Sequence, residues 1–433
     1  MTTRRLLSIN SYHYRRGGAD AVYLDHAALM ESLGWKNAFF AMHYPQNDPT
    51  EWSRYFIDEI QFGHDYSLGQ KIVKASKVIY SFEAQRKLRH LIADFQPDIA
   101  HIHNIYHHQS PSILPVLKRA GIPSVMTAHD LKIACPNNKM LNRTGICERC
   151  KGGRFHEVIR YRCVQDSLAA STIVAAESTL HRWLDSYARN LDRIIVPSRF
   201  YLEKFVQWGW RRDLFAYVPN YVDASGFAPA YRPGDYFLFF GRLAEEKGVA
   251  TLVEAAARSG VRLKLAGTGP LDTDLKAIAA RSGADIEFLG FRTGPGLHAL
   301  VGGSRAVVLP SEWYENAPIS VLEAFALGKP VIGADIGGIP ELVRPGETGW
   351  LFKSGDVDGL SAALQTVRGL PDAEIEGLGR QARTLVAHDF SRRRYVESIL
   401  EIYSALGVRI AQPAAVQPSA DRKSTRLNSS HRH

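Results

Sequence analysis

The sequence predicts an α/β protein built from two parallel, doubly wound sheets. The chain has 433 residues, roughly three times a common domain length of about 150, so two domains are expected. Strand-like apolar runs alternate with amphipathic helical stretches, and this alternation stops at a proline-rich segment and then restarts. A composition with 45% hydrophobic and 22% charged residues excludes the disordered, fibrous and membrane-embedded classes.

The first half begins with a predicted strand at residues 5–8, which a Gly-Gly loop and a helix over residues 21–33 follow. Further strands are predicted at 98–103, 122–127 and 193–196, with helical sequence between most of them. Repetition of strand, helix and strand indicates a parallel sheet. We therefore expect a Rossmann-like domain over residues 1–222, with a cysteine-rich insertion at 135–163.

A linker is predicted at residues 219–233, where three prolines interrupt the periodicity. Beyond it, strands are expected at 236–240, 262–266, 286–289, 306–309 and 330–332, and helices at 248–259 and 318–327. This pattern predicts a second Rossmann-like domain over residues 223–388. Two such domains that face each other form a cleft, and open parallel sheets bind ligands beyond the carboxyl ends of their strands.

The end of the chain, residues 409–433, is expected to be disordered, because it is rich in small and polar residues and lacks apolar periodicity. From residue 411 onward it holds four basic residues and one acidic residue, and so carries +3 of the formal net charge of +9. A basic excess suits nucleic acid, an anionic membrane surface or a phosphorylated substrate. Total charge therefore does not identify the partner.

We expect no secretory signal, because the first ten residues contain two arginines but only a short apolar stretch. No apolar run reaches the length of about 18 residues that a membrane span needs. We therefore expect a cytoplasmic protein. In a reducing compartment, four cysteines within one 29-residue stretch indicate metal binding before disulfides.

The most informative segment is residues 311–332. Its prolines and glycine predict a helix with Pro318 in the first turn. Glu315 then lies in the loop before this helix, and Glu323 lies in its second turn. The unpaired amides of the first turn would bind an anion. Carboxylates beside an anion site are useful where they hydrogen-bond sugar hydroxyls that flank a diphosphate.

The two glutamates are separated by seven residues in the context E-N-A-P-I-S-V-L-E-A-F-A-L-G-K-P-V. This segment resembles the E-x7-E signature of glycosyltransferase family 4, or glycosyltransferase group 1, whose members are retaining enzymes with the GT-B fold. The resemblance implies two facing Rossmann-like domains with a central cleft. It also implies that Glu315 contacts the donor sugar, that Glu323 contacts the ribose, and that Asn316 and Ala317 belong to the donor site.

The resemblance covers residues 1–408 and implies that a C-terminal helix, residues 389–408, crosses back to the first domain. The sequence F-F-G-R-L-A-E-E-K-G at residues 239–248 is similar to the family segment that binds the donor diphosphate, here through Arg242 and Lys247. A departing diphosphate gains negative charge, which fixed cations stabilise without a metal ion. We therefore expect metal-independent catalysis without a catalytic cofactor. An ordinary solvated loop is the alternative.

Two Asp-x-Asp sequences, at 272–274 and 356–358, are interpreted as helix caps and first-turn acids rather than as metal ligands. The resemblance assigns three further roles. It implies that the Gly17-Gly18 loop closes over the donor phosphates, that His129 lies at the reaction centre, and that the backbone near Phe291 contacts the nucleotide base. A Gly-Gly pair is also an ordinary turn, and a core histidine is the alternative for position 129. We interpret His101 and His103, which share one strand face, as structural or acceptor-facing.

Four cysteines, Cys135, Cys147, Cys150 and Cys163, form the pattern C-x11-C-x2-C-x12-C. Four thiolates can complete a tetrahedral zinc site, and the closed coordination sphere would make that zinc structural rather than catalytic. The usual pair of C-x2-C knuckles is missing. Reduced thiols and disulfides therefore stay open as alternatives.

These features predict a retaining glycosyltransferase that transfers a hexose-type sugar from a nucleoside diphosphate sugar to an acceptor hydroxyl. A glycan or a lipid-linked glycan is the expected acceptor, in polysaccharide or glycolipid biosynthesis. The alternative is a sugar-nucleotide epimerase or a phosphorylase with the same fold. A nucleic-acid-binding protein with a zinc module is disfavoured, because no basic-aromatic motif of a known binding fold occurs, and we expect no nucleic-acid partner.

Helical sequence at residues 69–95 carries six basic residues between apolar positions: Lys71, Lys74, Lys77, Arg86, Lys87 and Arg89. A solvated pair of amphipathic helices explains this pattern. The alternative is peripheral contact with an anionic membrane at the inner face of the cell membrane, which a lipid-linked acceptor would require.

Overall fold

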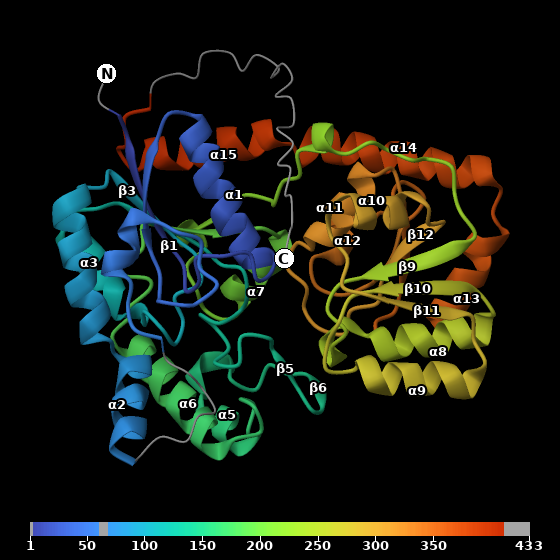
Figure 1. Cartoon of the computed structure of the whole chain (residues 1–433). Helices are drawn as coiled ribbons and strands as arrows, with labels where there is room; N and C mark the ends of the chain where they lie inside the picture. The colour runs from blue at the N-terminus through green and yellow to red at the C-terminus, as the bar shows by residue number, and fades with distance from the viewer. Residues whose placement is uncertain (1–2, 60–67, 411–433) are drawn as a thin grey trace, which may run out of the picture.

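The computed structural model describes residues 3–59 and 68–410. It contains two six-stranded sheets that lie side by side with helices packed around them (Figure 1). The strand order is β2-β1-β3-β4-β7-β8 in one sheet and β11-β10-β9-β12-β13-β14 in the other, and all neighbouring strands are parallel. The predicted α/β class is therefore confirmed. Within the described ranges, no helix is both long and apolar enough to cross a membrane.

We call the elements from β1 to β8 the first half. Its sheet strands are β1 (Arg5–Ile9), β2 (Lys36–Phe40), β3 (Ile99–Ile102), β4 (Ser124–Thr127), β7 (Arg193–Val196) and β8 (Phe215–Tyr217). Its helices are α1 (Gly18–Ser32), α2 (Leu68–Ile79), α3 (Phe82–Phe95), α4 (Leu114–Arg119), α5 (His156–Arg160), α6 (Leu168–Trp183) and α7 (Arg199–Gln207). A small antiparallel hairpin of β5 (Leu141–Asn142) and β6 (Gly145–Ile146) lies within the cysteine-rich insertion.

We call the elements from β9 to α14 the second half. Its strands are β9 (Tyr236–Phe240), β10 (Arg262–Ala266), β11 (Ile286–Gly290), β12 (Ala306–Leu309), β13 (Val331–Ala334) and β14 (Gly349–Phe352). Its helices are α8 (Val249–Ser259), α9 (Asp272–Ser282), α10 (Gly294–Gly302), α11 (Ile319–Ala326), α12 (Ile339–Leu342), α13 (Val357–Gly369) and α14 (Asp372–Asp389). The described chain ends with α15 (Arg392–Ala405).

Helix α15 follows the second half in sequence but packs on the first (Figure 1). Its buried Tyr395, Ile399 and Tyr403 belong to one apolar cluster with Leu6 of β1 and Val125 of β4. Two larger clusters form the cores around the two sheets. The last helix therefore ties the end of the second half to the first sheet through buried apolar surface, the dominant stabilising contribution in folding.

Three strands of the two large sheets, β2, β8 and β14, were not expected from the sequence. Their local signals are weak: β2 starts with a lysine and an asparagine, β8 has three residues, and β14 starts with a glycine. Each becomes a strand by pairing with a stronger neighbour, namely β1, β7 and β13. Of the predicted tail, residues 411–433 lie outside the described residues, as do the side chains of Lys71 and Lys74.

Candidate functional site

Several predicted site residues lie at the points where the strand order of the two sheets reverses. In the second sheet this point is between β9 and β12, and in the first between β1 and β3. Doubly wound sheets bind ligands there, because the loops leaving the two central strands diverge to opposite faces. The loop after β9 carries Arg242 and Lys247, and the loop after β12 carries Glu315. The Gly17-Gly18 pair follows β1.

Lys247 and Glu315 contact each other directly. The Lys247 Nζ atom lies 2.6 Å from Glu315 Oε1, and the Ser311 hydroxyl donates to the same oxygen at 2.7 Å. Glu315 is only 5% exposed, so both contacts fix the direction of a buried carboxylate. The side chain of Lys247 is half-buried. An incoming diphosphate would therefore meet a cation already held at the base of the site.

A glycine makes this contact possible. Gly248 has a φ of +63°, and a Cβ atom placed on it would lie 1.9 Å from the carbonyl oxygen of Pro310. No other residue fits, because the backbone of the β9 loop runs directly against the start of the β12 loop. The close approach places Lys247 within reach of Glu315. Gly248 is therefore required by the packing of two loops against each other, which the local sequence around Lys247 does not reveal.

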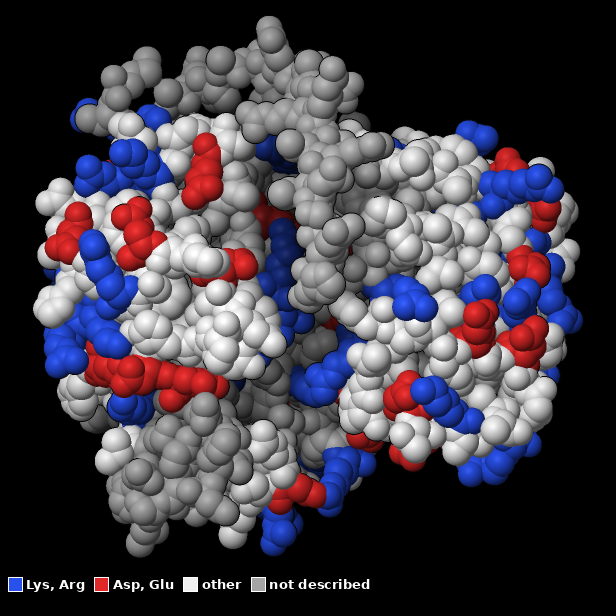
Figure 2. All heavy atoms as spheres, viewed as in Figure 1, with Lys and Arg blue, Asp and Glu red and all other residues white. Residues whose placement is uncertain are grey.

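Arg242 is the exposed cation of this region. Its guanidinium lies 4.0 Å from Glu246, and 63% of its side chain is exposed. Glu246 also contacts Lys139 of the cysteine-rich insertion, at 3.2 Å. Lysine and arginine side chains gather along the hollow between the two halves in the space-filling view (Figure 2). A hollow lined by cations attracts an anionic ligand.

The amino-terminal ends of two helices face each other across this hollow. Helix α11 begins at Ile319, and Pro318 is its cap residue with a ψ of 116°, so the proline precedes the helix instead of lying in its first turn as predicted. Gly18 begins α1, and a Cβ atom placed there would lie 3.9 Å from Ile319 Cδ1. First-turn amides have no acceptor within their own helix. Two positive helix ends therefore point toward one anion-sized region.

Asn316 and Ala317, both predicted in the donor site, join the two halves in the structure. The Asn316 side-chain amide donates to the carbonyl oxygens of Ala128 and His129 at 3.1 and 3.3 Å, and its oxygen accepts from Ser198 at 2.8 Å. The Ala317 carbonyl accepts from Asn220 at 2.9 Å. These groups hold the β12 loop against the first half. Their place in the donor site stays a prediction.

His129 follows β4 and is placed by a second histidine. Its Nε2 atom lies 2.8 Å from Nδ1 of His103, and the rings are stacked with centroids 5.1 Å apart. Burial lowers the pKa of His129 to about 4, so the imidazole is neutral near pH 7. His101 stacks next in line and bonds Thr127 and Tyr403. A neutral His129 can form hydrogen bonds with ligand hydroxyls but adds no positive charge.

Glu323 and Phe291 are available to a ligand. The carboxyl group of Glu323 is half-buried on α11 and makes no hydrogen bond with the described residues. Burial raises its pKa to about 7, which marks a carboxyl group in a poorly solvated place. Phe291, just after β11, is 71% exposed. An unpaired carboxyl group and an exposed aromatic ring suit a ribose and a flat base.

The four cysteines predicted as zinc ligands lie within the described residues. All four are free thiols, with Cys135 and Cys150 buried and Cys147 and Cys163 partly exposed. Burial and the three neighbouring thiols raise the pKa of Cys150 to about 12, so the four lie near one another. In residues 3–59 and 68–410, however, no group of three or more His, Cys, Asp or Glu side chains is placed to hold a metal ion.

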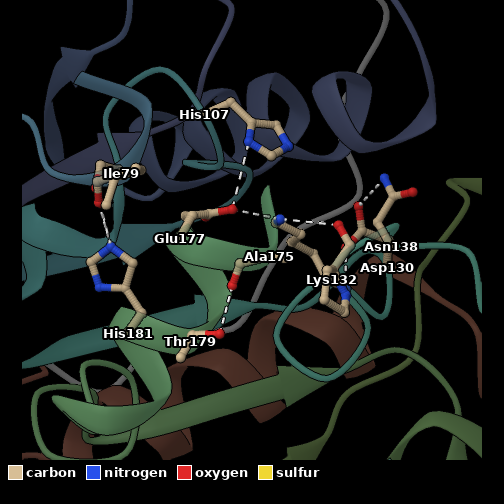
Figure 3. Close-up of polar contacts among 11 residues, drawn as sticks. Ile79, His107, Asp130, Lys132, Asn138, Ala175, Glu177, Thr179 and His181 are labelled. Atoms are coloured by element: carbon tan, nitrogen blue, oxygen red, sulfur yellow. Dashed lines mark hydrogen bonds and ion pairs between the residues drawn. The ribbon is translucent and has the colours of Figure 1, made fainter. Parts of the chain in front are cut away.

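Residues that the sequence did not reveal support the loop after His129 (Figure 3). Asp130 accepts from the Lys132 amide at 2.9 Å and from Asn138 at 3.3 Å, and burial raises its pKa to about 6. The Lys132 Nζ atom lies 2.7 Å from Glu177 of α6, and each side chain is 2% exposed. A cavity of about 320 Å³ opens beside this pair. No local signal predicts it, since the partners are 45 residues apart.

Comparison with known proteins identifies the family. The family model described as Glycosyltransferase Family 4 matches residues 16–225, and the model described as Glycosyl transferases group 1 matches residues 228–374. Together they span both halves of the molecule.

Curated relatives match part of the chain. A putative colanic acid biosynthesis glycosyltransferase, WcaL, of Escherichia coli is 26% identical over 254 residues, which is 54% of this chain and 62% of that protein. The glycogen synthase of Mycobacterium tuberculosis is 35% identical over 213 residues, which is 45% of this chain and 50% of that protein. The match thus spans about half to three fifths of the length of these relatives.

Solved structures match almost the whole chain. Sucrose-phosphate synthase from Thermosynechococcus elongatus aligns with a TM-score of 0.69 and 19% identity, over 93% of this chain and 99% of that one. Anabaena HepE, solved in complex with UDP and glucose, aligns with a TM-score of 0.64 and 19% identity, over 93% and 100% of the two chains. These likenesses confirm the predicted GT-B architecture. The chain therefore belongs to glycosyltransferase family 4, the group 1 glycosyltransferases.

Proposed function

We propose that this protein is a retaining glycosyltransferase that moves a hexose-type sugar from a nucleoside diphosphate sugar to an acceptor hydroxyl, in the assembly of a polysaccharide or glycolipid. The observation that carries the proposal is the contact of Lys247 with the buried Glu315 at the strand-order reversal. This contact places a cation that can bind a diphosphate directly beside a carboxylate that can accept hydrogen bonds from sugar hydroxyls. The names of WcaL, of the glycogen synthase and of the HepE complex with UDP-glucose support the same substrate class.

Each side chain has a role in this proposal. Arg242, Lys247 and the first-turn amides of α11 hold the diphosphate and stabilise the charge that grows on it as the bond from the sugar anomeric carbon breaks. The acceptor oxygen forms the new bond to that carbon and gives its proton to the departing diphosphate. Glu315 orients the sugar, while Glu323 accepts hydrogen bonds from the ribose. These fixed cations take the role that a divalent ion fills elsewhere, so catalysis is proposed to be metal-independent.

Three residues from the two halves complete the proposed site. His129 and Gly18 contribute from the first half, where the neutral imidazole bonds a sugar hydroxyl and the glycine leaves room for the phosphates. Phe291 packs on the base from the second half. Because Asn316 already bonds Ala128 and His129, the β12 loop brings these contributions together in one closed arrangement.

A ligand screen tests the proposal. UDP-glucose, UDP-galactose and GDP-mannose are added to the protein, and the melting temperature is measured for the wild type, Glu315→Ala and Lys247→Ala. We expect one donor to stabilise the wild type and both variants to lose that stabilisation. Lys276→Ala is the matched control, because Lys276 pairs with Asp272 on the surface of α9. Equal stabilisation of all four proteins would sink the site assignment.

The reaction type is tested with the same donors. Release of nucleoside diphosphate that requires an added glycan or lipid-linked acceptor is the expected result. Conversion of the donor sugar without an acceptor would instead favour the epimerase alternative. Transfer that persists in the presence of a chelator supports metal independence, and loss of transfer that added Mg²⁺ restores would contradict it.

We also propose that the acceptor is reached at an anionic membrane surface through the α2–α3 face. Phe82 is 75% exposed there, while Lys77 and Lys87 are already paired with Glu83 at 2.7 and 3.1 Å. In this proposal the exposed aromatic ring inserts into the membrane interface. Flotation with vesicles of anionic phospholipid measures it. We expect Phe82→Ala to bind less than wild type, and absence of wild-type binding at low salt would refute the proposal.

A further inference from the structure

Tyr314 belongs to the second half but packs in the core of the first. It lies in the loop after β12, and its ring packs against the apolar cluster of the first sheet. The ring centroid is 4.9 Å from that of Phe200 in α7. The Tyr201 hydroxyl donates to the Tyr314 carbonyl at 3.0 Å. The Tyr314 side chain of the second half thus occupies a socket that Phe200 and its neighbours in the first half form.

The cysteine-rich insertion closes this socket. The Tyr314 hydroxyl donates to Glu148 Oε1 at 3.0 Å, and Lys204 donates to the same oxygen at 2.7 Å. The Lys204 side chain is 10% exposed, and its Nζ atom lies 4.8 Å from the Tyr314 ring centroid. Burial opposes ionisation of Glu148, but the bonds from Lys204 and Tyr314 outweigh it and lower its pKa. The acceptor of the Tyr314 hydroxyl is therefore a carboxylate.

Tyr314 directly precedes Glu315, and Asn316 directly follows it. Asn316 bonds the carbonyls of Ala128 and His129, so the first half holds the chain on both sides of Glu315. Gly337, at a φ of +63°, lets its own segment pass directly behind this loop, because a Cβ atom there would lie 2.4 Å from the Glu315 carbonyl oxygen. These contacts help to fix the position of Glu315 relative to the first half.

We propose that Glu148 and Tyr314 form a latch between the halves, in which both act as positioning residues that align Glu315 with the reaction centre of the first half. This inference rests on the proposed function for the identity of the reaction. It gives the cysteine-rich insertion a task, since Glu148 lies within the Cys147–Cys150 turn. In this proposal the insertion holds the two halves together through Glu148.

The latch is proposed to affect the alignment of Glu315 with the first half and to have little effect on the binding of the nucleotide. Most groups proposed for the nucleotide, including Arg242, Lys247 and Glu323, lie on the second half, whereas His129 and the Gly17-Gly18 loop lie on the first. Loss of the latch should therefore lower kcat and change the affinity for the free nucleotide little. A hydrogen bond to a charged acceptor is worth more than one between neutral groups, so removing it from Tyr314 should reduce kcat roughly tenfold, a change of about 1.4 kcal/mol in the barrier.

The experiment uses the full chain and the variants Tyr314→Phe, Glu148→Gln and their combination. The Kd for UDP and for GDP is measured by calorimetry, and kcat is measured with the donor found in the screen. Tyr236→Phe is the matched control, because it removes a hydroxyl that donates to Leu300 at 2.7 Å inside the second half. We expect Tyr314→Phe to lose kcat roughly tenfold with Kd little changed, and the double variant to lose no more than that, since coupled partners are not additive.

Small-angle X-ray scattering gives a second readout that needs no activity. The radius of gyration should be larger for Tyr314→Phe than for the wild type and the control, because the halves separate more often. If the wild type transfers no sugar from any donor tested, the proposed function fails, and the scattering result alone decides the latch. An unchanged radius, an equal kcat loss in Tyr236→Phe, or a weakened Kd in place of a lowered kcat would each overturn the inference.

Discussion

The two halves build their sides of the groove in different ways. In the second half, Lys247, Glu315 and Glu323 come from two short segments, each directly after a strand, so the strand order alone brings them together. In the first half, His129 is placed by residues distant in sequence, with His103 at its ring and the buried pair of Lys132 and Glu177 behind its loop. Motifs are local, so they reveal the second half better than the first.

The two sides also differ in their electrostatics. The second half offers partly exposed cations, such as Arg242, to a ligand. The first half buries the ion pair of Lys132 and Glu177 behind the loop of His129. Burial lowers the pKa of His26 to about 3 and of His129 to about 4, so these two imidazoles are neutral near pH 7. Charge is therefore placed where an anion would bind, while the other side contributes shape and hydrogen bonds. This difference can be tested one residue at a time.

The largest effect is expected from Lys132→Ala, which should lower the stability of the first half. The variant leaves the buried Glu177 without its partner, and an uncompensated buried charge costs about 3–5 kcal/mol. Urea denaturation should show this loss in the free energy of unfolding. Lys118→Ala is the control, because its pair with Asp192 is half exposed and should contribute no more than about 1 kcal/mol. Similar small losses in both variants would show that the buried pair does not support this half.

Lys247→Ala should affect activity more than stability. Removing a fixed group that stabilises developing charge lowers kcat by about 10²–10³, whereas Glu315 keeps its bond from Ser311. Steady-state release of nucleoside diphosphate measures the rate, and the melting temperature without ligand measures the fold. Lys276→Ala serves again as control. A normal kcat in Lys247→Ala would contradict the proposal that the second half supplies the cation for the diphosphate.

Phe291→Ala should weaken nucleotide binding by a moderate amount. Stacking of a base on an aromatic side chain is worth about 1–3 kcal/mol, so the Kd should rise roughly fivefold or more. Titration calorimetry with UDP and GDP gives the value. Phe82→Ala, which removes an equally exposed ring on the first half, should leave that Kd unchanged. Equal effects of the two variants would argue against a base site at Phe291.

The smallest effect is expected in the pH dependence of nucleotide binding. The pKa of Glu323 is raised to about 7 by burial, and only the ionised carboxylate accepts hydrogen bonds from both ribose hydroxyls. Affinity should therefore rise as the pH increases through 7, by no more than about tenfold for one proton. Glu323→Gln should flatten this dependence. A pH profile of Kd that is identical in the variant would refute the assignment of the ribose to Glu323.

Much of the second half could be predicted because its signals are short-range. The E-x7-E and R-x4-K patterns each lie within one loop-and-helix unit, and the strand order places those units side by side. The exact helix start could not be predicted: Pro318 is the cap residue, since its ψ of 116° is extended. The role of Asn316 was also missed, because its partners lie 187 and 188 residues away.

The sequence by itself determined the class of fold and the family, and it predicted the two-part organisation and the cations and carboxylates proposed for the donor, because strand periodicity and loop motifs are written in neighbouring residues. Only the tertiary structure decided how the halves meet. The latch of Glu148 and Tyr314, the pair of Lys132 and Glu177, and the spacing of the four thiols each depend on packing between segments far apart in the chain. Those contacts are set by burial and shape, which no local pattern encodes.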